Sequence, residues 1–322
     1  MNGNVITRLC RDLNRQMGFF GELEGCGFEI VADEFSACFP GHARIERLWT
    51  GARWSEGPAW FAAGRYLLWS DIPNNRMLRW DETNGQVSTF RAPSNNSNGN
   101  SVDATGRLIS CEHLSRRVTR TNYDGSISIL ADRYDGKRFN SPNDLVVKRD
   151  GSIWFTDPSY GIKSDYEGDR ADSELPCQVY RIDPAGRITV VADDFVMPNG
   201  LAFSPDEKKL YIADSGIVDG PTHIRQFAVG DDGDSLTGGD IFAKCTAGVF
   251  DGFRCDTGGR IWTSAADGVH CYNPHGELIG KLKIPELVAN VTFGGAKRNR
   301  LFICGTTSLY SVYLTVNGCT PG

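Results

Sequence analysis

Six polar side chains recur at one position of a repeated pattern, about eight residues before a turn of the kind that glycine favours. They are Glu56, Asn98, Asn143, Asn199, Asp251 and Asn290. The turns follow one another roughly every 40 to 55 residues. Carboxylates and amides offer oxygen ligands, and clusters of such oxygens bind hard divalent cations. The pattern therefore predicts a metal site built from several separate segments.

Four of the six residues form the expected ligand set, which carries two negative charges. They are Glu56, Asn143, Asn199 and Asp251. Asn98 and Asp144 could join them. The expected cofactor is one divalent cation, Ca²⁺ in the first place, with Mg²⁺, Mn²⁺ or Zn²⁺ as alternatives. Four protein ligands leave positions for water and a substrate, as a catalytic ion requires.

A second interpretation of the same residues needs no metal. Asn or Asp before Gly often forms a turn, so Asn199-Gly200 and Asp251-Gly252 each read alone as turn dipeptides. Six polar groups on one axis could also line a water-filled channel, because buried polar groups need partners. The shared register of all six, with apolar strand residues after them, favours the metal.

The elements that position these residues are short strands. A β-rich run follows each turn: Tyr66–Trp69, Arg107–Ser110, Ser152–Phe155, Lys209–Ile212, Arg260–Thr263 and Arg300–Ile303. A repeat of this length that reads strand, turn, strand is typical of a β-propeller. Six copies would point six equivalent side chains at one axis. The fold class expected is therefore an all-β, six-bladed β-propeller with a central metal site.

The repeats divide the chain into an N-terminal extension, 1–27, and a propeller, 28–322. The extension is either a helix or a mobile tail. The expected blades span about 52–92, 95–133, 140–193, 196–245, 248–288 and 289–318. Ala43–Thr50 should pair with Leu309–Leu314 and close the ring. Lys163–Pro176 is acidic and polar and reads as a loop over one face. Asp150-Gly151, Asp232-Gly233 and Gly238-Gly239 read as hairpin turns.

Composition excludes several classes of function. The 322 residues are 40% hydrophobic and carry a net charge of −6, which argues against nucleic-acid binding. No apolar run reaches the length of a membrane span, and no secretory signal is visible, so a cytoplasmic monomer or weak homo-oligomer is expected. The ten cysteines show no CxxC spacing. We expect reduced thiols, with a link from Cys38 to the N-terminal region as the exception.

Longer motifs carry a family resemblance. They are SEGPAW (Ser55–Trp60), CEHLSRRVTR (Cys111–Arg120), GKRFNSPNDLVVKRDGSIWFTDPSYGI (Gly136–Ile162), MPNGLAFSPD (Met197–Asp206), FDGF (Phe250–Phe253) and GRIWTS (Gly259–Ser264). In their order and spacing, these motifs resemble those of the gluconolactonase branch of the SMP-30/gluconolactonase/LRE-like family, and the resemblance covers about residues 28–316. The resemblance implies a six-bladed propeller with an axial divalent cation that hydrolyses sugar lactones.

The resemblance also implies roles for individual residues. The family's metal-binding glutamate, asparagine and aspartate fall on Glu56, Asn199 and Asp251, and Asp251 would be the general base. The asparagine near metal and substrate falls on Asn143. A substrate-contacting arginine of one family branch falls on Ser141, so that contact is missing and Arg138 is its candidate substitute.

The expected reaction is attack of water on a lactone carbonyl that the metal polarises, with Asp251 taking the proton. Further candidate substrate-binding residues are Asn143, Asn98, His113, Arg138 and Tyr160. As a lone histidine, His113 also fits a structural role, and Tyr160 could equally pack in the core. A phosphotriesterase or arylesterase on the same scaffold, or a non-catalytic binding propeller, are the alternatives.

Overall fold

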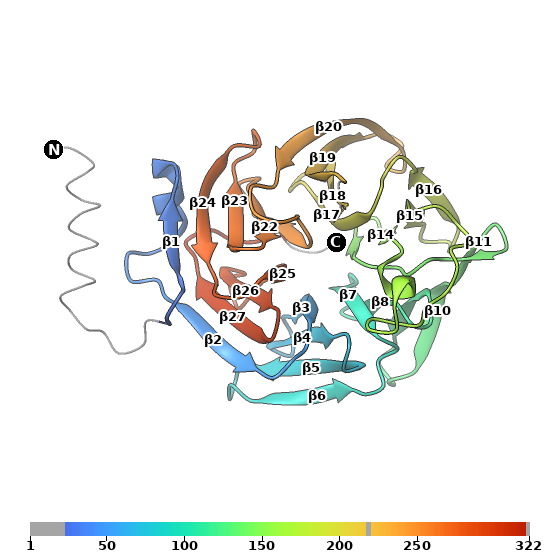
Figure 1. Cartoon of the computed structure of the whole chain (residues 1–322), viewed down its shortest axis with the longest axis horizontal. Helices are drawn as coiled ribbons and strands as arrows, with labels where there is room; N and C mark the ends of the chain where they lie inside the picture. Colours follow the sequence, from blue (N-terminus) through green and yellow to red (C-terminus); the bar gives the residue numbers. More distant parts are fainter. Residues whose placement is uncertain (1–22, 217–219, 320–322) are drawn as a thin grey trace.

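The computed structural model describes residues 23–216 and 220–319. Six antiparallel sheets surround a central axis (Figure 1), which confirms the predicted six-bladed, all-β propeller. The N-terminal extension predicted over 1–27 falls mostly on residues outside the described range. The first described strand, β1, begins at Gly27.

Each blade runs from an innermost strand at the axis to an outermost strand at the rim. Blade one has β3 (Ser55–Phe61), β4 (Tyr66–Asp71), β5 (Arg76–Asp81) and β6 (Val87–Arg91). Blade two has β7 (Ser97–Val102), β8 (Leu108–Glu112), β9 (Arg117–Thr121) and β10 (Ile127–Ala131). Blade three has β13 (Leu145–Val147), β14 (Ile153–Asp157), β15 (Gln178–Ile182) and β16 (Ile188–Ala192).

The second half of the ring repeats this order. Blade four has β17 (Pro198–Phe203), β18 (Lys209–Ser215), β19 (Thr222–Val229) and β20 (Leu236–Lys244). Blade five has β21 (Phe253–Cys255), β22 (Ile261–Ala265), β23 (Gly268–Tyr272), β24 (Leu278–Lys283) and β1 (Gly27–Ile30). Blade six has β25 (Val288–Gly294), β26 (Arg300–Gly305), β27 (Ser308–Tyr313) and β2 (Ile45–Thr50). Outside the blades lie η1 (Asp33–Cys38), α2 (Tyr160–Lys163) and a small hairpin of β11 (Arg133–Tyr134) and β12 (Lys137–Arg138).

The two ends of the chain close the ring as predicted. β2 pairs antiparallel with β27, with Ile45 opposite Val312, so the outermost strand of blade six comes from the N-terminal side. β1 adds a fifth strand to blade five, where Gly27 lies opposite Lys283. Figure 1 shows β1 beside β24 and β2 beside β27. The sequence repeat did not predict the position of β1, because β1 belongs to no repeat of its own.

Apolar residues on the strands pack between neighbouring blades. Trp69, Trp154 and Trp262 each occupy the second strand of a blade and are fully buried. Trp154 meets Phe203 of the next blade edge to face, with ring centres 5.5 Å apart. Burial of such large apolar side chains supplies most of the free energy that holds neighbouring blades together.

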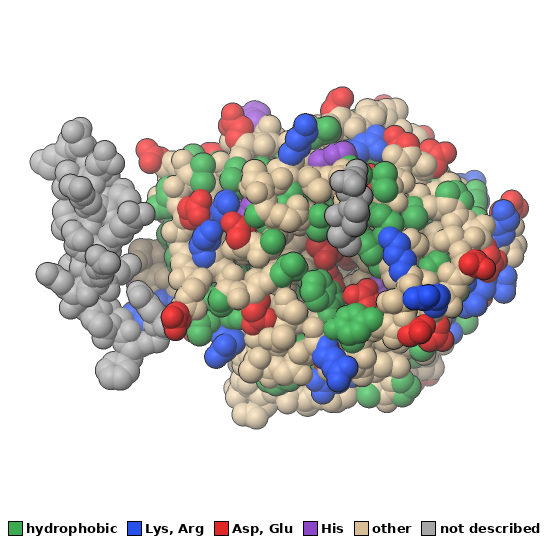
Figure 2. All heavy atoms as spheres, in the orientation of Figure 1, with side chains coloured by type: hydrophobic (Ala, Val, Ile, Leu, Met, Phe, Trp, Pro, Cys, Tyr) green, Lys and Arg blue, Asp and Glu red, His purple; other side chains and the backbone are tan. Residues whose placement is uncertain are grey.

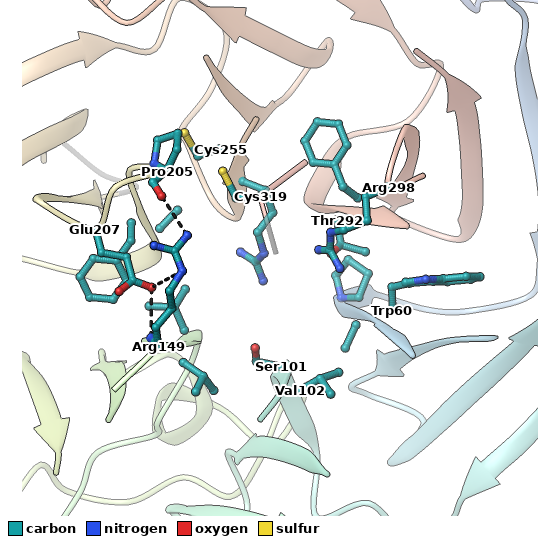
Figure 3. A pocket seen from close by; sticks show the side chains of 18 of the residues that line it. Trp60, Ser101, Val102, Arg149, Pro205, Glu207, Cys255, Thr292, Arg298 and Cys319 are labelled. Atoms are coloured by element: carbon teal, nitrogen blue, oxygen red, sulfur yellow. Dashed lines mark hydrogen bonds and ion pairs between the residues drawn. The ribbon is translucent and has the colours of Figure 1, made fainter. Parts of the chain in front are cut away.

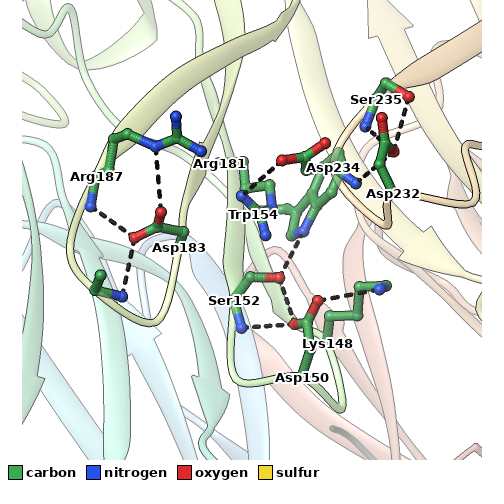
Figure 4. Close-up of polar contacts among 11 residues, drawn as sticks. Lys148, Asp150, Ser152, Trp154, Arg181, Asp183, Arg187, Asp232, Asp234 and Ser235 are labelled. Carbon is green, nitrogen blue, oxygen red and sulfur yellow. Dashed lines mark hydrogen bonds and ion pairs between the residues drawn. The ribbon is translucent and has the colours of Figure 1, made fainter.

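Aspartate side chains accept hydrogen bonds within the hairpin turns of the blades. In blade three, Asp150 Oδ1 accepts hydrogen bonds from Ser152 N at 2.8 Å and Ser152 Oγ at 2.6 Å (Figure 4). Trp154 Nε1 donates to the same hydroxyl at 3.0 Å. Asp232 makes equivalent contacts to Ser235 in blade four. The predicted turns at Asp150-Gly151 and Asp232-Gly233 therefore hold.

One predicted turn is wrong. Gly238 and Gly239 lie inside β20, where the pairing with β19 shifts register between Gln226 and Phe227. Both glycines have positive φ, 87° and 103°. A bulge in a long strand needs the same conformational freedom as a turn, so the dipeptide alone does not distinguish them.

The described cysteines are free thiols. Cys38, for which we expected a link to the N-terminal region, lies in the core beside Cys271, and each thiol is the other's hydrogen-bond partner. Cys10 lies outside the described residues. No helix in 23–216 or 220–319 has the length and apolar character needed to cross a lipid bilayer.

Candidate functional site

Bulges in the innermost strands turn several of the six recurring polar residues toward the axis. We call these six, Glu56, Asn98, Asn143, Asn199, Asp251 and Asn290, the ring residues. In four blades the pairing with the second strand shifts register at this position: between Glu56 and Ala59, Ser97 and Asn100, Pro198 and Leu201, and Val288 and Asn290. A bulge re-aims one side chain and increases local twist. Residues that share one position in the sequence repeat therefore point their side chains in the same direction, toward the propeller axis.

Glycines beside the ring residues allow neighbouring blades to approach closely. A Cβ on Gly57 would lie 1.9 Å from Asn98 O, and a Cβ on Gly200 would lie 2.1 Å from Asp251 O. Gly200 N donates to Asp251 O at 3.1 Å. The turn interpretation of Asn199-Gly200 is therefore wrong, because Gly200 lies inside β17 and serves this contact.

The ring opens into a cavity of about 400 Å³ on one face of the propeller. Figure 2 shows acidic side chains at the bottom of the central depression. The cavity brings together six of the predicted site residues: Glu56, Asn98, Asn143, Tyr160, Asn199 and Asp251. Asn290 lies beside Glu56 and donates from Nδ2 to its Oε2 at 2.9 Å.

The carboxyl groups in the ring repel one another in a poorly solvated place. Burial and, after it, the charge of the neighbouring Asp144 raise the pKa of Glu56 to about 8, against a hydrogen bond from Asn290 that lowers it. Burial raises the pKa of Asp251 well above its usual value, and Glu56 and Asp144 add to that effect. Without a positive charge between them, these groups hold protons that carboxylates ordinarily lose near neutral pH.

The amides of the ring present oxygens that lack partners. The side-chain oxygens of Asn98 and Asn199 are buried and accept no hydrogen bond from the protein. Buried acceptors without partners cost free energy, so such atoms indicate a ligand or water. Within the described parts of the chain, no group of three or more His, Cys, Asp or Glu side chains is placed to hold a metal. An ion on this axis would therefore need the amide oxygens as well as the carboxylates, and the donors present fit a hard cation.

His113 lies behind the ring and not on the cavity wall. It is fully buried, its Nε2 is 3.2 Å from Asn98 Nδ2, and burial lowers its pKa to about 4. On the other side, its Nδ1 lies 3.9 Å from Glu167 Oε2. Asn98 Nδ2 donates to His113 Nε2 when the neutral imidazole carries its proton on Nδ1, and this tautomer orients the Asn98 amide.

Arg138 and Tyr160 lie in different environments. Arg138, in β12, lies away from the cavity lining and donates from Nη2 to Ser115 O at 3.4 Å. Tyr160 begins α2 and lines the cavity, where its hydroxyl donates to Ser215 O at 2.9 Å. The structure therefore brings Tyr160, but not Arg138, to the ring.

Two lining residues escaped the sequence patterns. Glu167 projects from the loop predicted over one face, and burial raises its pKa to about 7. Trp54 precedes β3 and adds an aromatic wall. Neither belongs to the repeat. The acidic character of the Lys163–Pro176 loop was the one available signal for Glu167.

Comparison with known proteins finds one family that matches most of this chain. The SMP-30/Gluconolactonase/LRE-like region matches residues 54–307. A gluconolactonase from Zymomonas mobilis is 32% identical over 299 residues, covering 83% of this chain and 80% of that protein. A solved gluconolactonase from Xanthomonas campestris is 42% identical, with a TM-score of 0.85 over 90% of this chain and 95% of its own.

A more distant relative is the 6-deoxy-6-sulfogluconolactonase of Pseudomonas putida, which is 28% identical and covers 77% of this chain and 81% of that protein. The matched region contains every ring residue, from Glu56 to Asn290, and all blade strands except β1, β2 and β27. The chain belongs to the SMP-30/gluconolactonase/LRE-like family.

Proposed function

We propose that this chain is a metal-dependent hydrolase that opens neutral sugar lactones in the axial cavity. The observation that carries the proposal is the convergence of two raised-pKa carboxyls, Glu56 and Asp251, with the unpartnered oxygens of Asn98 and Asn199. A divalent cation would relieve both costs together. Glu56, Asn143, Asn199 and Asp251 would hold it, and Ca²⁺ suits an all-oxygen set.

The class of reaction rests on similarity. The gluconolactonases compared above are 32% and 42% identical to this chain over 80% and 95% of their own length. The chain is accordingly an ester hydrolase that acts on lactones. The cavity is concave, encloses several polar groups and has the size of a small-molecule site.

The residues divide the work of hydrolysis. When bound, the ion supplies positive charge that keeps the carboxylates ionised and polarises the lactone carbonyl. Asp251 takes a proton from the attacking water as the new C–O bond forms. It returns that proton to the ring oxygen when the lactone C–O bond breaks. Its position is fixed because its backbone N–H donates to Ser264 Oγ at 2.9 Å.

The lining charges define the substrate. The described cavity wall carries three carboxyls, Glu56, Glu167 and Asp251, and no Lys or Arg. The proposed cation would balance Glu56 and Asp251 but not Glu167, so a phosphate, sulfonate or carboxylate placed near Glu167 would meet repulsion. Apolar residues, among them Trp54, Val249 and Leu287, offer a surface for the C–H face of a sugar ring. A neutral lactone fits both halves of the wall.

A proton-release assay over a panel of lactones, with and without a chelator, tests this function. We expect hydrolysis of neutral aldonolactones that the chelator abolishes and Ca²⁺ restores. Mg²⁺, Mn²⁺ and Zn²⁺ in the same assay rank the alternative ions. Faster turnover of an organophosphate triester or an aryl ester than of every lactone would replace the proposal. Binding of ligands with no turnover in any ion would favour a non-catalytic propeller.

A further inference from the structure

The C-terminal segment crosses the face of the propeller opposite the lactone cavity. After β27 the chain returns to the axis and forms an antiparallel bridge between Gly318 and Asp256 of blade five. Cys319 N donates to Cys255 O at 3.1 Å, and Thr257 N donates to Asn317 O at 2.8 Å. This register places Cys255 and Cys319 directly opposite each other.

The backbone geometry at this pair suits a disulfide. Residues that face each other as a hydrogen-bonded antiparallel pair have Cα atoms about 5.5 Å apart. Disulfides span Cα separations of roughly 4.4–6.8 Å. The thiols of Cys255 and Cys319 are also hydrogen-bond partners. Figure 3 shows the two sulfur atoms beside each other at the wall of a pocket.

The two thiols differ in access. Both line a narrow cavity of about 90 Å³ at this end of the axis. Cys255 is only 4% exposed and packs in the apolar core between blades four and five, whereas Cys319 is partly exposed. A small reagent that enters from solvent therefore reaches Cys319 first.

The surroundings also differ in what they do to each thiol. The hydrogen bond from Cys255 is the main cause that lowers the pKa of Cys319, and Arg298 and Arg149 lower it further against the effects of burial and Asp256. The same contact, with burial, raises the pKa of Cys255. The guanidinium groups of Arg149 and Arg298 line the same cavity (Figure 3). Cys319 is thus the thiol that ionises, and the thiolate is the nucleophile.

We propose that Cys319 and Cys255 form a peroxide-reactive dithiol whose disulfide ties the C-terminal segment to the innermost strand of blade five. The Cys319 thiolate attacks one peroxide oxygen, the O–O bond breaks, and the released hydroxide takes a proton to become water. Cys255 sulfur then attacks the sulfenic acid, loses its proton and displaces a second water. Two thiols are oxidised to one disulfide, and one peroxide is reduced to two waters.

A second thiol pair provides the matched control. Cys38 and Cys271 are also mutual hydrogen-bond partners, yet both are fully buried in the core between blades five and six. If contact between thiols were enough, this pair would oxidise equally well. Because access differs, we expect it to stay reduced.

The experiment treats the full chain with hydrogen peroxide at neutral pH and maps peptides by mass spectrometry without reduction. The expected product is a Cys255–Cys319 cross-linked peptide that has lost two hydrogen atoms and that a thiol reductant separates. In Cys255→Ser, a dimedone-type reagent should label a sulfenic acid on Cys319. In Cys38→Ser, the cross-link should form as in the wild type.

Two outcomes would overturn the proposal: Cys319 stays reduced while Cys38 or Cys271 is oxidised, or Cys319 oxidises in Cys255→Ser without any cross-link in the wild type. A thermal melt gives an independent readout. Oxidation should raise Tm by a few degrees in the wild type and not in Cys319→Ser, because a disulfide that closes a long loop restricts the unfolded chain. An unchanged Tm alongside a mapped cross-link would contradict the tying of the segment.

Discussion

Asn290 donates a hydrogen bond to Glu56 at 2.9 Å although 234 residues separate them in the sequence. The contact joins the innermost strands of the last and first blades, β25 and β3. It also fixes one oxygen of the buried Glu56 carboxyl and leaves the other for a ligand in the cavity. A structural bond and a candidate metal ligand therefore share one side chain.

Asp251→Asn should retain the fold and lose activity. The amide has the size of the carboxyl but cannot accept the proton from water, so kcat/KM should fall about 10²- to 10⁴-fold. Progress curves with a neutral aldonolactone measure the loss, and Tm checks the fold. Asp206→Asn, in an exposed turn, is the matched control. Turnover close to that of the control would remove Asp251 from its role as base.

Ca²⁺ should stabilise the protein in proportion to its concentration. At 100 times its Kd an ion that binds only the folded state contributes about 2.7 kcal/mol to the free energy of unfolding. Glu56→Gln keeps the acceptor for Asn290 Nδ2 but removes one charge, so the Tm shift with Ca²⁺ should shrink strongly. Differential scanning calorimetry over a calcium series measures it. Equal shifts in both proteins would place the ion elsewhere.

The ion-free protein should lose stability as pH rises. The pKa of Glu56 lies near 8 in the folded protein against an ordinary value of 4.5, so the folded state binds more protons between those values. The contribution of Glu56 to the free energy of unfolding is fully present below pH 4.5, and it is lost as pH rises through about 8. Glu167, with a pKa of about 7, acts in the same direction.

Melting curves in chelator across this pH window check the sign. Glu56→Gln should flatten the pH dependence, and saturating Ca²⁺ should reverse it, because the ion binds the ionised carboxylates. A wild-type Tm that rises with pH in chelator would show that Glu56 is ionised in the ion-free fold.

A phosphate group on the substrate should impair hydrolysis. Placing it beside Glu167, whose charge the proposed ion does not balance, costs several kcal/mol, which corresponds to at least about 100-fold in kcat/KM. Glucono-1,5-lactone and its 6-phosphate give the comparison. Glu167→Gln should narrow the ratio by removing one repulsive charge while leaving turnover of the neutral substrate nearly unchanged. Equal rates for the two lactones in the wild type would contradict a neutral-substrate site.

Gly200→Ala should damage both stability and activity. The new methyl group would overlap Asp251 O, 2.1 Å from its ideal position, so blades four and five must separate. Such overpacking costs about 1–3 kcal/mol and displaces the proposed base. Gly41→Ala, with no atom within 4 Å of the added carbon, is the control. Urea denaturation and kcat measure the two effects.

The sequence predicted the ring because one register recurs in every blade. Glu56, Asn143, Asn199 and Asp251 follow local motifs that a repeat makes visible, and the closure of β2 on β27 follows from the need to cover a free edge. Glu167 and the bulge at Gly239 could not be found in that way. Their roles depend on what lies across the cavity or on the neighbouring strand, which no periodicity records.

The pairing of β2 with β27 has a consequence for biosynthesis. Glu46 in β2 contacts Ser311 and Arg300, which lie more than 250 positions later in the chain. Blade six therefore cannot acquire its outermost strand until almost the whole polypeptide has been synthesised. During translation Ile45–Thr50 is an unpaired strand, and its free edge is able to pair with a strand of another nascent chain. A stop codon before Ser308 would remove β27 and leave β2 without a pairing strand. The propeller would then stay open even with every ring residue present.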